Sequence, residues 1–75
     1  MKKIMAFVVR NEDGMLNLVM GATPYKLNIH GNGYWAIPDN QIENCYIEEI
    51  QNDKFPQVKW EDAEPTKVEL TIKIK

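Results

Sequence analysis

Cysteine and histidine are nearly missing from this sequence. Cys45 and His30 are the only residues of their types in a chain of 75. A single cysteine excludes an internal disulfide, and small secreted domains are usually held together by several disulfides. The scarcity therefore favours the reducing cytoplasm as the location. A structural zinc site needs about four nitrogen, sulfur or carboxylate ligands close together, so we expect no metal and no cofactor.

Long hydrophobic runs are lacking as well. The apolar run from Ile4 to Val9 follows two lysines and ends at Arg10. It resembles the start of a signal peptide, but it is too short, and no small-residue cleavage site precedes Glu12. A membrane span needs about 20 apolar residues. We therefore expect no membrane association, and we interpret this run as a buried first strand.

The chain has no large excess of one charge. The formal net charge is −2, from 9 basic and 11 acidic residues. A dedicated nucleic-acid-binding protein usually carries a basic excess, so the composition argues against that class but leaves room for a local basic patch. The length predicts one domain over residues 1–75. Because so short a chain buries little core, self-association as a homodimer would add stability.

The clearest structural signal is the segment from Tyr25 to Ile37. In its first half, Tyr25, Leu27 and Ile29 alternate with polar residues, which is typical of a strand with one buried face. Asn32-Gly33 tolerates the positive φ angles of a tight turn. The sequence thus predicts a hairpin that turns at Asn32-Gly33, and we expect the other strands to pair against this hairpin as the centre of the fold.

Further strands are predicted on both sides of this hairpin. The nearly continuous apolar segment from Lys3 to Arg10 indicates a central strand covered on both faces. A turn at residues 11–14 leads to a returning strand over residues 15–20. The apolar–polar–apolar piece from Val58 to Trp60 predicts a short edge strand. Strict alternation over residues 67–75 predicts a last amphipathic strand that is paired into a sheet.

The segment from Ile42 to Ile50 fits two interpretations. As a helix it would be capped by Asp39 and would place most of its apolar residues on one face. As a strand it has suitable β-branched and aromatic residues at its centre, although Glu48 and Glu49 suit a strand poorly. We favour the strand, with a single helical turn over Asp39 to Ile42.

These segments predict an all-β fold. Five to seven short strands separated by turn signals are typical of a small antiparallel barrel or sandwich. If a short helix forms near residues 40–50, the class becomes α+β instead.

No residue pattern indicates catalysis. His30 lies beside the predicted turn, and an exposed turn-flanking histidine is its commonest role. Cys45 is more often a small buried hydrophobe than a nucleophile. No helix follows Gly31-Asn32-Gly33, so these glycines form a turn rather than a phosphate-binding loop. We therefore expect the protein not to be an enzyme.

The aromatic residues of the hairpin suggest a binding surface. Tyr34 and Trp35 are consecutive, so in a strand one of them is directed away from the buried face. An exposed ring there could form a protein-binding hot spot or stack on a base. The candidate binding residues are Tyr25, Lys26, Asn28, His30, Tyr34 and Trp35. The alternative is that both faces are covered, one by the core and one by a loop or a second subunit.

Acidic residues gather in the second half of the chain. They are Glu43, Glu48, Glu49, Asp53, Glu61, Asp62 and Glu64. Such a face could attract a basic partner, or it could simply be solvated and oppose aggregation at a sheet edge.

The sequence predicts a small non-enzymatic binding module. Its expected role is protein–protein interaction, or inhibition as an accessory protein, through an exposed sheet face or edge. The alternative is a small barrel that binds single-stranded nucleic acid or a nucleotide. It would stack bases on Tyr34 or Trp35 and hold phosphates with Lys26, Lys67 and Lys73.

Overall fold

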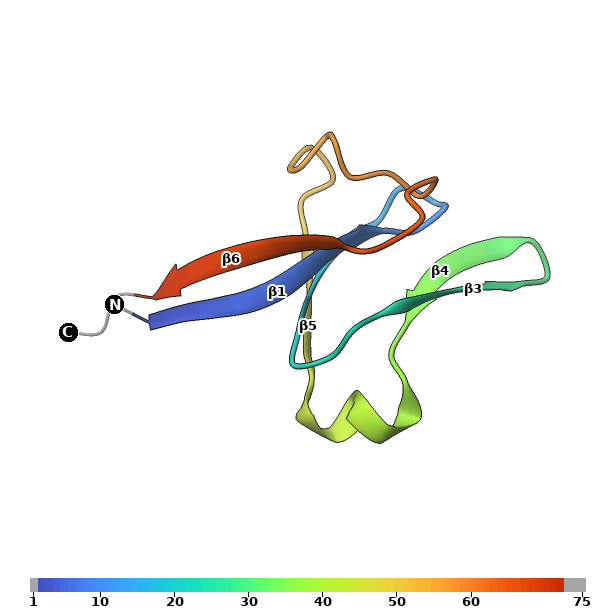
Figure 1. The fold of residues 1–75 in the computed structure, drawn as a ribbon. Coiled ribbons are helices and arrows are strands. Elements are labelled where there is room, and N and C mark those ends of the chain that lie inside the picture. The colour runs from blue at the N-terminus through green and yellow to red at the C-terminus, as the bar shows by residue number, and fades with distance from the viewer. Residues whose placement is uncertain (1, 73–75) are drawn as a thin grey trace.

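The fold consists of two antiparallel sheets. The computed structural model describes residues 2–72. The elements are β1 (Lys2–Arg10), β2 (Leu16–Met20), β3 (Tyr25–Ile29), β4 (Asn32–Ala36), the 3-10 helix η1 (Asp39–Asn44), β5 (Tyr46–Ile50) and β6 (Thr66–Ile72). Four strands form a sheet in the order β5-β2-β1-β6, and β3 and β4 form a separate hairpin (Figure 1). The all-β prediction is confirmed, as a sandwich-like fold rather than a closed barrel. The predicted strand residues 73–75, including Lys73, lie outside the described residues.

β1 is the centre of the larger sheet. It pairs with β2 on one side and with β6 on the other. Val8 and Val9 are both buried, and consecutive strand residues point to opposite faces, so each contributes to a different core. The prediction of a central strand covered on both faces is confirmed. The prediction that the hairpin is the centre of the fold is wrong, because among the described strands β3 and β4 pair only with each other.

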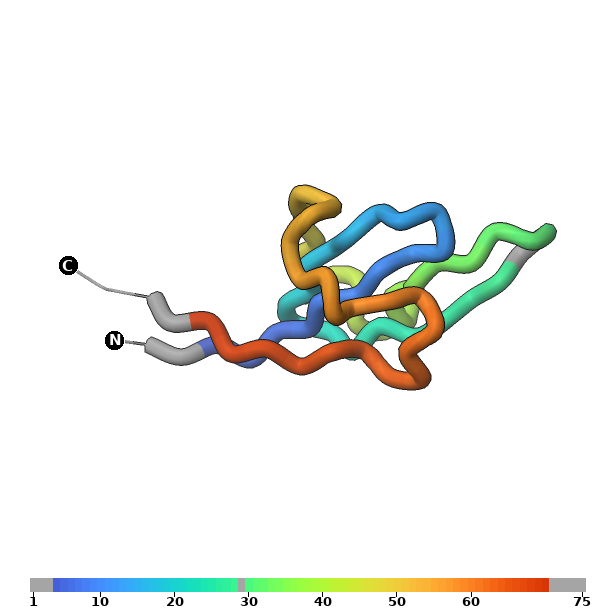
Figure 2. The backbone as a smooth tube through the Cα atoms, turned by 90° about the horizontal axis from the view of Figure 1, so that it is seen from above, coloured from blue at the N-terminus to red at the C-terminus, as the bar shows by residue number. Residues whose placement is uncertain are grey.

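Each face of the larger sheet has its own small core. On the first face, Val8 and Leu16 pack with Val58 from the loop between β5 and β6. On the second face, the core is formed by Val9, Val19 and Ala22, with residues of β4 and the η1 region packed against it. The molecule measures 46 × 30 × 18 Å, and the hairpin projects at the end opposite to the paired ends of β1 and β6 (Figure 2). Stacked layers pack about 10 Å apart. The smallest dimension of 18 Å therefore leaves room for only a thin layer of residues over each face of the larger sheet.

The predicted edge strand from Val58 to Trp60 does not form. The segment lies in the loop between β5 and β6, where the Val58 amide donates to the Phe55 carbonyl at 2.9 Å in a turn. Val58 is only 1% exposed and fills the first core. The alternation that suggested a strand arises because Val58 enters the core while Lys59 stays in solvent.

The only arginine of the chain fixes this loop. All five N–H groups of the Arg10 guanidinium donate to backbone carbonyls, at distances from 2.7 to 3.3 Å. The acceptors are the carbonyl oxygens of Gly14, Asn52, Lys54, Phe55 and Val58. The side chain thus connects the end of β1 to a loop that has no strand pairing of its own.

The segment after β4 divides into a helical turn and a strand. η1 spans Asp39–Asn44 and β5 spans Tyr46–Ile50. The strand interpretation is confirmed, with a longer helical segment than expected and with Pro38, not Asp39, at the N-cap. Glu48 and Glu49 are tolerated in β5 because it is an edge strand and both side chains are exposed.

The hairpin turns at His30-Gly31, so the predicted turn at Asn32-Gly33 is wrong. Ile29 pairs with Asn32, which leaves a two-residue loop whose φ angles are 54° at His30 and 82° at Gly31. Two successive positive φ angles are typical of a type I′ hairpin turn. Gly33 is used differently: a Cβ atom there would overlap the Trp60 ring.

Threonine substitutions distinguish the two turn positions. We expect His30→Thr to lower the free energy of unfolding by about 1 kcal/mol or more, because a β-branched residue at positive φ is strained. Asn32→Thr should change it by less than about 0.5 kcal/mol, because Thr suits a strand position. Urea unfolding of both variants measures this. A larger loss in Asn32→Thr than in His30→Thr would place the turn at Asn32-Gly33.

Arg10 should also carry an unusual share of the stability. We expect Arg10→Met to lower the free energy of unfolding by at least about 2 kcal/mol, because hydrogen bonds from a charged group contribute roughly 1.5–3 kcal/mol each and some of these are exposed. Urea unfolding followed by tryptophan fluorescence reports the loss. Lys67→Met removes one charge from an exposed site on β6 and should cost less than about 0.5 kcal/mol. Equal effects of the two substitutions would contradict this role.

Candidate functional site

The hairpin brings only some of the predicted binding residues together. Lys26 pairs with Trp35 and Asn28 with Gly33, so Lys26, Asn28 and Trp35 share one face. The remaining residues of the candidate set, Tyr25, His30 and Tyr34, lie elsewhere: the tyrosines on the opposite face and the histidine exposed in the turn. The predicted group is therefore divided between two surfaces.

Trp35 is used for internal packing. Its side chain is half-buried and packs against the core of Val9, Val19 and Ala22. The indole Nε1 donates to the Arg10 carbonyl at 3.1 Å. Both the ring and its polar atom are engaged within the molecule, which is the covered alternative that the sequence left open for this residue.

Trp60 joins this face of the hairpin, a contact that no local sequence pattern indicated directly. The Trp35 and Trp60 rings meet edge to face, with centroids 6.3 Å apart and an interplanar angle of 80°. The Lys26 Nζ lies 4.7 Å from the Trp60 centroid and 5.4 Å from that of Trp35. Such distances are favourable for cation–π attraction, so Lys26 has an internal partner. The indirect signal was Gly33, since a glycine within a strand often marks the close approach of another group.

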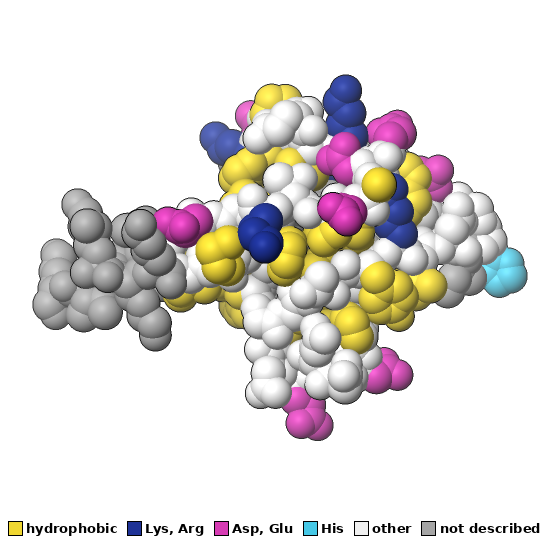
Figure 3. All heavy atoms as spheres, viewed as in Figure 1, with side chains coloured by type: hydrophobic (Ala, Val, Ile, Leu, Met, Phe, Trp, Pro, Cys, Tyr) yellow, Lys and Arg dark blue, Asp and Glu magenta, His cyan; other side chains and the backbone are white. Residues whose placement is uncertain are grey.

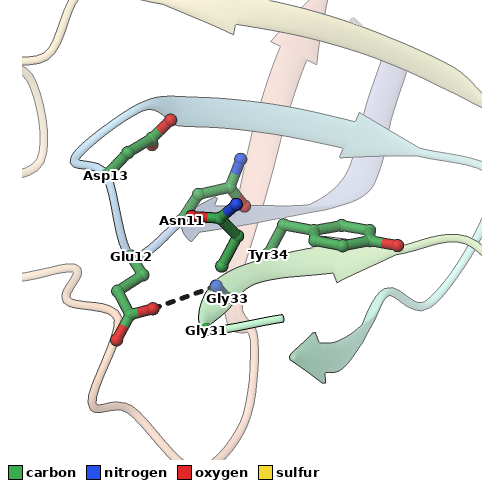
Figure 4. Close-up of a pocket in the computed structure, with 7 residues that line it drawn as sticks. Asn11, Glu12, Asp13, Gly31, Gly33 and Tyr34 are labelled. Atoms are coloured by element: carbon green, nitrogen blue, oxygen red, sulfur yellow. Dashed lines mark hydrogen bonds between the residues drawn. The ribbon is translucent and has the colours of Figure 1, made fainter. Parts of the chain in front are cut away.

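A shallow pocket lies where the β1–β2 turn meets the hairpin (Figure 4). Its volume is about 590 Å³, and it is lined by Asn11, Glu12, Asp13, Gly31, Asn32, Gly33 and Tyr34. The Gly33 amide donates to Glu12 Oε1 at 3.0 Å, and the Glu12 amide donates to the Gly33 carbonyl at 2.9 Å. Asn11 Oδ1 accepts from the Trp35 amide at 3.0 Å. These groups attach β4 to the larger sheet, so the polar lining of the pocket already has a structural role.

β5 forms one edge of the four-stranded sheet. β5 pairs with β2 on one side, and no strand of the described chain pairs with its other side. Tyr46 is 52% exposed and Ile47 is 50% exposed, and Ile42 of the preceding η1 is 51% exposed. Three large hydrophobic residues therefore lie on the surface along one short stretch of chain.

The same stretch is acidic throughout. Residues 39–53 contain no Lys, Arg or His. Their carboxylates, all exposed, are those of Asp39, Glu43, Glu48, Glu49 and Asp53. Asp and Glu side chains, without Lys or Arg, are visible over the η1 region at the bottom of Figure 3. We name Ile42, Tyr46, Ile47, Glu48 and Glu49 together the β5 edge surface.

The sequence identified the acidic residues of this surface but could not identify the surface itself. Exposure of Tyr46 and Ile47 follows from the position of β5 at the end of the strand order. The poor fit of Glu48 and Glu49 to a buried strand was the available signal of an edge.

Comparison with known proteins gives no guide to this surface: no family model, curated protein or solved structure matches the chain. Within residues 2–72, no group of three or more His, Cys, Asp or Glu side chains is placed to hold a metal ion. The described helix is neither long enough nor apolar enough to cross a bilayer.

The contact between Gly33 and Trp60 can be tested by substitution. We expect Gly33→Ala to lower the free energy of unfolding by about 1–3 kcal/mol, because the added methyl group overlaps the Trp60 ring and forces a shift. In a Trp60→Leu background the same substitution should cost less than about 0.5 kcal/mol. Urea unfolding of the four proteins measures this coupling. An unchanged cost in the Trp60→Leu background would show that the ring is not the obstacle.

Proposed function

We propose that this protein is a non-enzymatic binding module that acts by protein–protein interaction through the β5 edge surface. The observation that supports this most directly is an unpaired strand edge with exposed Tyr46 and Ile47. An open edge offers unpaired backbone groups to another chain, and proteins usually protect such edges with lysine, proline or bulges. Here the protection is limited to acidic side chains, which leaves the edge open to a suitable partner.

The hairpin supports the proposal less well. Lys26 and Trp35 are engaged in contacts with Arg10 and Trp60, so their use by a partner would disrupt the packing of the molecule. Tyr25, Asn28 and His30 remain exposed, but they do not form one cluster with an apolar centre. We therefore favour the edge over the face that the sequence suggested.

Nucleic-acid binding has weaker support for the same reason. It would stack bases on Tyr34 or Trp35 and hold phosphates with Lys26; Trp35 and Lys26 have internal partners, and Tyr34 lies on the face opposite to Lys26. Lys67 lies on β6, which pairs with β1 rather than with the hairpin. We further propose a cytoplasmic location, where Cys45 would remain the free thiol that it is here. Binding would be inhibitory when the partner surface that is covered has a function of its own.

Affinity purification with matched baits tests this proposal. Three tagged baits are compared in a lysate of the source organism: the wild type, Tyr46→Ala/Ile47→Ala, and Tyr25→Ala/His30→Ala. We expect proteins captured by the wild type to fall at least about tenfold with the edge bait, because truncating interface hot spots costs more than ~1 kcal/mol each. Quantitative mass spectrometry measures the capture, and far-UV circular dichroism checks that each bait is folded.

The hairpin bait is the control and should retain the captured proteins. Loss of capture with the hairpin bait alone would move the contact surface to the hairpin. If no protein depends on either pair of residues, the protein is not an interaction module of this kind.

A further inference from the structure

We infer that the partner of the β5 edge surface is an extended, positively charged chain segment that adds to β5 as a further strand. This inference rests on the proposed function and specifies the chemistry and the binding mode of the partner. It follows from the direction of the backbone groups, the order of the side chains along β5 and the charge of the surrounding chain.

The backbone groups at the open edge can be assigned from the strand pairing. In antiparallel pairs, successive residues direct their N–H and C=O groups alternately toward one neighbour and toward the other. The Asn11 amide donates to the Met15 carbonyl at 2.8 Å, which sets the phase of this alternation for β1 and β2. The observed registers of β1 with β2 and of β2 with β5 extend the same alternation to β5. The backbone N–H and C=O groups of Ile47 and Glu49 therefore point to the open edge. An added strand can therefore form hydrogen bonds to two residues of β5.

The side chains along the edge are ordered in a simple way. Tyr46 and Glu48 point to one face of the sheet, and Ile47 and Glu49 point to the other. Each face thus presents one apolar residue followed by one acidic residue. Directly opposite residues on neighbouring strands interact, and opposite charges or apolar pairs are favourable. An antiparallel partner strand would match this order with two basic residues followed by two apolar residues.

The surrounding charge reinforces the preference for a basic segment. Three further exposed carboxylates, those of Asp39, Glu43 and Asp53, flank the two of β5, and no cationic side chain lies between residues 39 and 53. Complementary charge of this kind accelerates association and disfavours partners of the same sign. The partner segment should therefore carry basic residues beyond the four that lie opposite β5.

The same charges argue against a second copy of this chain at the edge. If two copies of β5 paired antiparallel over their full length, Glu48 of each copy would lie opposite Glu48 of the other, and each Ile47 would lie opposite Glu49. Like charges directly opposite each other destabilise a pair of strands. The homodimer that chain length favours is therefore not expected to form through this strand.

A synthetic peptide tests strand addition. The probe is an acetylated and amidated peptide with the core Lys-Arg-Val-Ile, flanked by Lys and Gly. We expect it to bind the wild-type protein at low ionic strength, with chemical-shift changes in the ¹⁵N spectrum at Ile47 and Glu49 and slower hydrogen exchange of both amides. A peptide of the same sequence with N-methylated core residues keeps the side chains and should lose binding. A Glu-Glu-Val-Ile peptide should not bind.

A matched pair of variants tests the role of charge. Glu48→Gln/Glu49→Gln should bind the Lys-Arg-Val-Ile peptide roughly three- to tenfold more weakly, since each cross-strand charge pair contributes ~0.2–1 kcal/mol. Glu61→Gln/Glu64→Gln makes the same change in net charge at exposed loop positions and should bind like the wild type. Equal weakening in both variants would mean that only net charge attracts the peptide, which contradicts strand addition.

The remaining outcomes separate this inference from the proposed function. If the peptide does not bind, or binds equally well when N-methylated, strand addition is wrong. The interaction module still stands in that case, provided that protein capture depends on Tyr46 and Ile47. If both the capture and the peptide binding fail, the proposed function fails with the inference. Slow exchange of the Ile47 and Glu49 amides in the free protein, together with a dimer in sedimentation, would make a second copy the occupant.

Discussion

The guanidinium of Arg10 is the interaction on which most of this structure depends. Four of its five hydrogen bonds hold the β5–β6 loop against the first face of the sheet, so that Val58 can fill the core there, and the fifth goes to the Gly14 carbonyl in the β1–β2 turn. The backbone carbonyl of Arg10 accepts the indole proton of Trp35, which packs on the second face. A 75-residue chain buries only about 60% of its unfolded surface. Arg10 holds both the loop that covers the first face and the tryptophan that covers the second, which compensates for the small size of each core.

The way the hairpin is attached is the reason that we propose the binding surface elsewhere. Asn11 and Glu12 directly follow Arg10 and bind the outward-facing backbone of β4, which would otherwise be an open edge. Trp60 then packs on Gly33, beside Trp35 and Lys26. The polar and aromatic groups that could have met a partner are used to join the hairpin to the sheet. Among the described strands, only β2 pairs with β5, and we therefore propose the interaction surface at β5 rather than on the hairpin.

The sequence predicted those features that depend on neighbouring residues. Alternation and turn residues correctly identified β2 and β6, because burial of one strand face leaves a local pattern. A nearly continuous apolar run identified β1, and β-branched and aromatic residues favoured β5. The hairpin turn was misplaced because His30-Gly31 and Asn32-Gly33 both tolerate positive φ angles, and the choice depends on a contact between Gly33 and Trp60, which is distant in sequence. Trp35 was assigned to binding for a similar reason, since its partners at Arg10 and Trp60 are not visible locally. The order of the strands, which exposes β5, is a property of the whole fold and has no local pattern.

Glu48 and Glu49 bear on two requirements that usually conflict at a strand edge, namely resistance to self-pairing and access for a partner strand. An edge strand with exposed Tyr46 and Ile47 would be prone to pair with copies of itself. Lysine is the residue that commonly prevents this, and it would serve equally well against self-pairing. Glutamate prevents it too, but it also reverses the charge that an incoming strand must carry. Adjacent positions in a strand face opposite sides of the sheet. Two consecutive glutamates therefore favour a positively charged partner strand on both faces. Under the proposed strand addition, an edge protected in this way would exclude its own copies and acidic chains while its backbone would stay accessible to a basic one.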